Sequence, residues 1–115
     1  GTENGYKIAV DSNYDWGQDL MRLRDFTSEN HISVIYLDYF GGGSPKYYLG
    51  SKYVPWNSSK GYASGWVAIS ISTLQQAFGK PVAGFSRSEK DSYSWLNGYQ
   101  PVARAGESIF IYKLP

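Results

Sequence analysis

The residues of this sequence that could bind a ligand begin with a polar turn at residues 11–20, DSNYDWGQDL. Asp11 and Asp15 carry carboxylates, and Asn13 and Gln18 carry amides that form paired hydrogen bonds with hydroxyl groups. Trp16 adds a flat apolar face with a polar edge, which suits stacking on a sugar ring. This mixture of side chains predicts a site that recognises a carbohydrate or another acceptor molecule.

A second candidate segment follows an apolar run and consists of Asp38, Tyr39, Gly41, Gly42 and Gly43. Tyr39 is a second candidate for stacking, and the three glycines permit close approach by a ligand or by another part of the chain. A phosphate-binding loop is the alternative interpretation, but neither Gly-x-x-x-x-Gly-Lys-Ser/Thr nor Gly-x-Gly-x-x-Gly occurs here. A plain tight turn is therefore favoured over a phosphate site.

Catalysis and metal binding have weaker support. Asp11, Asp15 and Asp38 could together hold a divalent cation, but Asp15 also stands where a helix cap is expected. The same acids could act as a carboxylate pair for glycoside chemistry, without positive support. His31 has no evident Ser or Asp partner, and no Gly-x-Ser-x-Gly motif is present. We therefore expect no catalytic residue, no resident metal and no cofactor.

The elements that position these residues form a strand–helix–strand unit. An apolar run at 6–10 predicts a strand, helical spacing of apolar residues predicts a helix from about 16 to 29, and residues 32–40 predict a strand buried on both faces. Asn30-His31 is expected to end the helix. Strands of such a unit are parallel, so the tips that carry Asp11 and Gly41–Gly43 are expected to converge.

The remaining elements complete an α/β fold. Residues 45–50 predict one helical turn, and residues 51–65 predict a long polar loop. The further elements expected are a strand at 66–71, a helix at 72–78, a helix start at 88–96, an edge strand at 101–104 and a last strand at 108–112. The predicted architecture is a small Rossmann-like sheet in two or three layers, with the first three strands parallel and an antiparallel C-terminal edge hairpin.

Composition narrows the classes of protein. The 115 residues fit a single domain, with residues 1–5 expected to be flexible or derived from an expression tag. The net charge of +1 gives no reason to expect a nucleic-acid partner. There is no cysteine, which excludes disulfides, and no apolar run approaches the ~18 residues of a membrane span.

Aromatic residues make up 17% of the chain and divide by position. Those in predicted strands are expected in the core: Tyr36, Phe40, Phe110 and Tyr112. Those in or near turns are candidates for stacking on a sugar or packing on a partner: Tyr14, Trp16, Tyr39, Tyr47, Tyr48, Trp56 and Trp95.

Four segments carry a family resemblance: DSNYDWGQDL (11–20), YLDYFGGGSPKYYLG (36–50), SISTLQ (70–75) and YSWLNGYQPVARAGESIFIY (93–112). Together they resemble the soluble C-terminal domain of prokaryotic membrane glycosyltransferases of the dolichyl-phosphate-mannose protein mannosyltransferase (PMT)-like superfamily. The resemblance implies a parent protein that moves a sugar from a polyprenyl-phosphate carrier, with its catalytic groups in the membrane part. No position here matches those groups. This chain would then be the extracytoplasmic tail.

Three functions follow as hypotheses. The first is a noncatalytic module that binds or positions a glycan, protein or lipid acceptor, and its predicted ligand-binding residues are Asp11, Asn13, Asp15, Trp16, Gln18, Asp38, Tyr39, Gly41, Gly42 and Gly43. The second is a structural cap or oligomerisation domain that packs on the membrane part, with an exposed aromatic patch away from the strand ends. The third is a carboxylate-based hydrolase, with two acids close together and a raised pKa.

Overall fold

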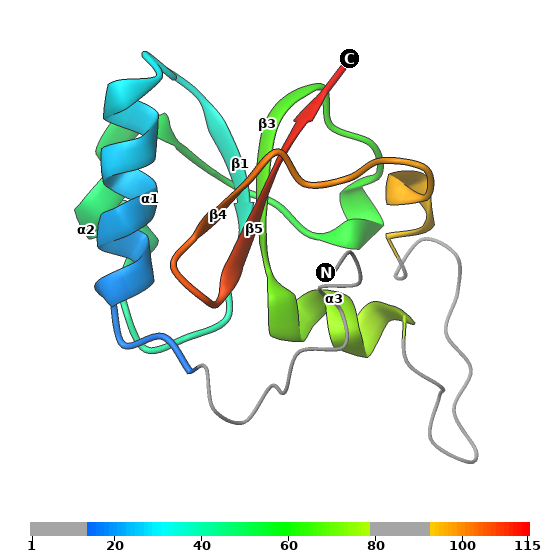
Figure 1. Cartoon of the computed structure of the whole chain (residues 1–115), viewed down its shortest axis with the longest axis horizontal. Coiled ribbons are helices and arrows are strands. Elements are labelled where there is room, and N and C mark those ends of the chain that lie inside the picture. The colour runs from blue at the N-terminus through cyan, green and yellow to red at the C-terminus, as the bar shows by residue number, and fades with distance from the viewer. Residues whose placement is uncertain (1–13, 79–92) are drawn as a thin grey trace.

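A computed structural model describes residues 14–78 and 93–115 of the chain, and its sheet has five strands (Figure 1). The strands are β1 (Ile35–Asp38), β2 (Tyr53–Pro55), β3 (Gly65–Ser70), β4 (Ala103–Ala105) and β5 (Ile109–Leu114). Their order across the sheet is β2-β1-β3-β5-β4. β1 is parallel to β2 and β3, whereas β5 is antiparallel to β3 and to β4. The predicted α/β class and the antiparallel C-terminal hairpin are confirmed.

Helices and short turns of helix connect these strands. They are α1 (Gln18–Glu29), α2 (Pro45–Leu49), α3 (Ile71–Phe78) and the 3₁₀ turns η2 (Gly50–Lys52), η3 (Ser58–Lys60) and η5 (Ser94–Leu96). α1 ends as predicted, because Asn30 donates from its backbone N–H and its side chain to the carbonyl of Phe26, and His31 adopts a φ of 55°. No helix in the described ranges is long and apolar enough to cross a membrane.

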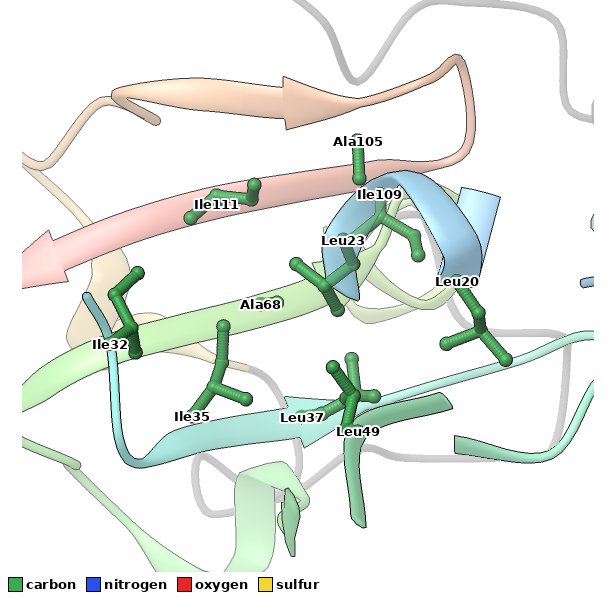
Figure 2. Close-up of a cluster of buried hydrophobic side chains, with 10 residues drawn as sticks. All are labelled: Leu20, Leu23, Ile32, Ile35, Leu37, Leu49, Ala68, Ala105, Ile109 and Ile111. Atoms are coloured by element: carbon green, nitrogen blue, oxygen red, sulfur yellow. The ribbon is translucent and has the colours of Figure 1, made fainter. Parts of the chain in front are cut away.

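Apolar side chains pack on both faces of the sheet. On one face, Leu20 and Leu23 of α1 pack with side chains of β1 and β5, and Figure 2 shows this cluster of ten buried residues. On the other face, Leu74 of α3 and Leu96 of η5 pack in a second cluster. Removing a leucine side chain of this kind from water stabilises the fold by about 2 kcal/mol. Apolar side chains are therefore buried on both faces of the sheet.

β5 shows how one strand supplies both cores. Ile109 and Ile111 belong to the cluster under α1, whereas Phe110, Tyr112 and Leu114 belong to the cluster under α3. Side chains of a strand alternate between the two faces, which is why the predicted last strand contributes to both clusters. The strand is longer than predicted and runs to Leu114.

Several predicted boundaries differ from the structure. The predicted loop at 51–65 is wrong, because it contains η2, β2 and η3. Among the described strands, β2 lies at the edge of the sheet, consists of three residues ending at Pro55, and pairs with β1. The predicted strand at 32–40 is confined to β1, and the edge strand at 101–104 is observed at 103–105. The strand predicted at 6–10, the expectation for residues 1–5 and the helix start at 88–92 lie outside the described residues.

Candidate functional site

The turn that precedes α1 and the glycine segment that follows β1 lie against each other. The backbone N–H of Gly42 donates to the backbone carbonyl of Asp15 over 2.7 Å, and the Tyr39 hydroxyl donates to Asp15 Oδ2 over 2.7 Å. The Gly43 N–H in turn donates to the Tyr39 hydroxyl oxygen over 3.1 Å. In Figure 1 these two segments meet at the lower left, below α1. The structure therefore brings together most of the described residues that the sequence singled out.

Asp15 orders the start of α1. Its Oδ1 accepts from the backbone N–H groups of Gly17, at 3.0 Å, and Asp19, at 2.8 Å. Gly17 is the residue that immediately precedes the helix, with a φ of 121°. The capping role predicted for Asp15 is thus present, but it acts from two residues before the cap position. Asp15 is only 1% exposed, and both of its carboxylate oxygens are used within the chain.

Gln18 completes this turn from the helix side. Its Oε1 accepts from the backbone N–H of Trp16 over 2.8 Å, two residues earlier, whereas a capping box would join residues three positions apart. The Gln18 side chain is exposed beside Trp16. Its amide is therefore a neutral polar group at the surface of the site.

Gly41, Gly42 and Gly43 are needed for the close approach of the chain to itself. A Cβ at Gly41 would lie 2.7 Å from the backbone oxygen of Asp15, and one at Gly42 would lie 2.7 Å from the Trp16 ring. A Cβ at Gly43 would lie 2.9 Å from the Cα of Gly17. The neighbour that approaches this segment most closely is the turn before α1, so the three glycines allow close approach within the chain itself.

Three aromatic side chains form an exposed group at this position, which we call the aromatic rim: Tyr14, Trp16 and Phe40. The Tyr14 and Trp16 ring centroids are 4.6 Å apart at 63°, and those of Tyr14 and Phe40 are 5.6 Å apart at 87°. Trp16 is 74% exposed, Phe40 54% and Tyr14 40%. The rim therefore presents apolar surface to solvent at the carboxyl ends of parallel strands.

The prediction for Phe40 needs correction here, and Tyr39 has a structural role besides the stacking role predicted for it. Phe40 was expected in the core, but β1 ends at Asp38, and the Phe40 N–H donates to the Ser70 hydroxyl over 2.8 Å, which leaves its ring at the surface. Tyr39 was expected to stack on a ligand, but it packs against the core under α1, and its hydroxyl is held by Asp15. Burial and the bond to Asp15 raise the pKa of Tyr39, so its phenol stays neutral.

Asp38 does not join this site. It accepts at Oδ2 from the Tyr93 hydroxyl over 2.6 Å, and Tyr93 belongs to the core under α3. Burial raises the pKa of Asp38, and the bond from Tyr93 partly offsets this effect. Burial and the neighbouring Asp38 also raise the pKa of Tyr93. Asp15 and Asp38 are therefore engaged on opposite faces of the sheet and do not form a carboxylate pair.

Asp19 is a buried carboxylate whose role the sequence did not suggest. Its Oδ2 accepts from the backbone N–H and hydroxyl of Ser108, at 2.9 Å and 2.7 Å, and from the N–H of Glu107. Its Oδ1 accepts from Arg22 over 2.7 Å. These bonds join the start of α1 to the β4–β5 turn, so they connect the first and the last of the four segments that carry the family resemblance.

Two predicted ligand-binding residues, Asp11 and Asn13, lie outside the described residues. Within residues 14–78 and 93–115, no three His, Cys, Asp or Glu side chains are grouped so that they could hold a metal ion. What the described part of the site offers is an exposed aromatic surface on a rigid hydrogen-bonded base, beside a neutral amide. No protein-family model, curated protein or solved structure matches this chain.

Proposed function

We propose that this chain is a noncatalytic recognition module, which binds a glycan or another acceptor for a polyprenyl-phosphate-dependent membrane glycosyltransferase. In this proposal the module lies on the extracytoplasmic face of the membrane and belongs to the same polypeptide as the membrane-embedded enzyme. The assignment to a glycosyltransferase rests on the four segments of family resemblance. The recognition role rests on the aromatic rim.

The observation that carries the recognition role is the exposure of Trp16. Its neighbours in the turn have structural partners: Asp15 caps the helix, Gly17 contacts Tyr48, and Asp19 holds Ser108. Trp16 is 74% exposed, so the packing of the described residues does not account for its side chain. A single exposed apolar residue is ordinary, but three adjacent exposed aromatic rings indicate an interaction surface.

The position of the rim supports ligand recognition over a structural cap. The cap hypothesis predicts an aromatic patch away from the strand ends, whereas Phe40 lies two residues past the end of β1, and its N–H donates to the Ser70 hydroxyl at the end of β3. Ligands of α/β sheets bind beyond the carboxyl ends of parallel strands. The hydrolase hypothesis has less support, because it needs two acids close together. Asp15 and Asp38 bond to different tyrosines on opposite faces of the sheet.

The test is a titration of the isotope-labelled chain with mannose, arabinose and oligosaccharides, followed by NMR. We expect chemical-shift changes at the Trp16 indole and at the amides of 40–43, with millimolar dissociation constants, which correspond to about 4 kcal/mol. Trp16→Ala should abolish the changes. Tyr62→Ala is the matched control, because Tyr62 is 43% exposed but contacts Pro115 beyond the far end of β5.

Two results would count against the proposal. One is the absence of any sugar-dependent change at Trp16. The other is a response that Trp16→Ala and Tyr62→Ala reduce equally. If Trp16→Ala instead abolishes self-association in analytical ultracentrifugation and no sugar binds, the structural cap is the correct alternative.

A further inference from the structure

The rings of the aromatic rim do not form a flat surface. The Tyr14 plane is inclined by 63° to Trp16 and by 87° to Phe40, at centroid distances of 4.6 and 5.6 Å. Several sugars of an extended, flat polysaccharide stack at once only on rings that share a plane. Rings at steep angles to one another leave one face for stacking and place the other rings as side walls. Trp16, the most exposed of the three, is the ring with a face to offer.

The rim also lacks exposed charge. Residues 14–18 and 39–44 contain one acidic residue, Asp15, and no basic residue. Asp15 is 1% exposed, and its carboxylate accepts hydrogen bonds from Tyr39, Gly17 and Asp19. Tyr39 stays neutral because burial and Asp15 raise its pKa. The polar group that accompanies the rings is the uncharged side chain of Gln18. An anionic ligand would gain no cationic partner from these residues.

We infer that the aromatic rim binds one neutral pyranose unit, such as the end of a glycan chain, with the sugar stacked on the exposed face of Trp16, beside the paired rings of Tyr14 and Phe40. This inference rests on the proposed function and specifies its ligand. It excludes two other classes of carbohydrate: the flat face of an insoluble polysaccharide, and sugars that are recognised through a phosphate or carboxylate.

The backbone beneath Trp16 supports a preformed site. The six-membered part of the indole lies directly against Gly42, where a Cβ would come within 2.7 Å of it. Gly42 is in turn held by its N–H bond to the Asp15 carbonyl. A ring placed in this way before binding loses less conformational freedom when the sugar arrives.

The experiment is an NMR titration of the 115-residue chain with six soluble probes, four neutral and two charged. The neutral probes are methyl β-D-glucopyranoside and methyl α-D-mannopyranoside, followed by cellobiose and cellotriose. The charged probes are glucuronic acid and mannose 6-phosphate. Binding to insoluble cellulose is measured in parallel by sedimentation, and each titration is repeated at about 50 and about 500 mM salt, which spans strong and weak screening.

We expect the trisaccharide to bind within about threefold of the monosaccharide, since a tenfold change would require a further 1.4 kcal/mol of contacts. The charged sugars should bind no tighter than the neutral ones, salt should change the affinity by less than about twofold, and cellulose should retain none of the protein. Trp16→Ala should remove the response to every soluble neutral probe.

The opposite results separate the inference from the proposed function. Affinity that rises more than about tenfold with chain length, or retention on cellulose, overturns the single-unit site while recognition of glycans stands. Tighter binding of mannose 6-phosphate that weakens in salt, and that Lys46→Ala removes, overturns the neutral site alone. If no probe shifts the Trp16 signals, the proposed function fails together with the inference.

Discussion

The hydroxyl of Tyr39 donates to Asp15 Oδ2 over 2.7 Å, and this bond joins the end of β1 to the turn that opens α1. The same hydroxyl accepts from the N–H of Gly43. One phenol oxygen therefore connects a helix cap, a strand end and a glycine turn. The position of the aromatic rim depends on this connection, because Trp16 directly follows Asp15 and Phe40 directly follows Tyr39 in the sequence.

Replacing Tyr39 by Phe should destabilise the fold. The variant leaves Asp15 Oδ2 and the Gly43 N–H without their partner, and loss of a hydrogen bond to a charged group costs about 1.5–3 kcal/mol. Urea denaturation followed by circular dichroism measures the change in the free energy of unfolding. Tyr47→Phe is the control, because Tyr47 is 80% exposed and should change stability by less than about 0.5 kcal/mol. Equal stability of the two variants would show that the Tyr39 bond is not important.

Replacing Asp19 by Ala should cost more than replacing any exposed acid. The substitution leaves the N–H and hydroxyl of Ser108 and the N–H of Glu107 without an acceptor, and the expected loss is about 2–4 kcal/mol. Asp25→Ala, which removes an exposed ion pair with Arg24, should cost at most about 0.5 kcal/mol. Thermal unfolding of both variants gives the comparison. A loss at Asp19 no larger than that at Asp25 would contradict the role assigned to it.

Substitution of the adjacent glycines should separate binding from stability. At Gly42 an added Cβ meets the Trp16 ring, an exposed side chain that can move, whereas at Gly43 it meets the Cα of Gly17 and Leu20 Cδ1. Gly42→Ala should therefore keep most of the stability but displace Trp16 and weaken sugar binding. Gly43→Ala should destabilise the fold by about 1–3 kcal/mol, as overpacking does. Chemical denaturation and the sugar titration, run on both variants, distinguish these outcomes, and the reverse ranking would be incompatible with the observed packing.

Asp38 should make stability fall as the pH rises above about 4. Burial raises its pKa from the ordinary 3.8, so between the unfolded and folded pKa values the native state holds the proton more often than the unfolded chain does. The free energy of unfolding therefore decreases through that window and stays lower above it. The Asp38→Asn variant has no carboxyl group at this position and does not show this decrease. Its free energy of unfolding relative to that of the natural chain should therefore increase from about pH 4 to about pH 7.

Tyr93→Phe provides the companion measurement. The Tyr93 hydroxyl stabilises the charged Asp38, so its removal should raise the pKa of Asp38 further. Titration of the Asp38 carboxyl carbon by NMR reports this directly. A pKa that falls or stays constant in Tyr93→Phe would show that the hydroxyl does not stabilise the carboxylate.

The spacing of apolar residues along the sequence predicted α1 and β5, because each of these elements shows its own periodicity. Leu20 and Leu23 follow the spacing of a helix that packs on a sheet, and the alternation of Ile109 and Phe110 follows that of a strand buried on both faces. β2 was missed because its three residues show no alternation of apolar and polar side chains. Its place in the sheet depends on pairing with β1, in which Tyr53 is the partner of Ile35, eighteen positions earlier in the sequence.

The site was predicted in part. Its location was expected, because the turn before α1 and the glycines after β1 both carry binding-type residues. The orientation of the side chains was not expected, because it depends on partners that are distant in the sequence. The Tyr39 hydroxyl donates to Asp15, 24 positions earlier, and the Ser70 hydroxyl accepts from the Phe40 N–H, 30 positions earlier. As a result Asp15 and Tyr39 form the base of the described site, and the aromatic rim and Gln18 form its surface.

The position of β5 determines when the protein can fold during synthesis. β5 is translated after the other four described strands, yet it lies between β3 and β4 and pairs with six residues of β3. A nascent chain that has not yet released residue 114 from the ribosome lacks side chains for the clusters under both α1 and α3. The sheet therefore closes only after translation of β5 is complete, and a chain stalled before Ile109 should be readily cut by proteases.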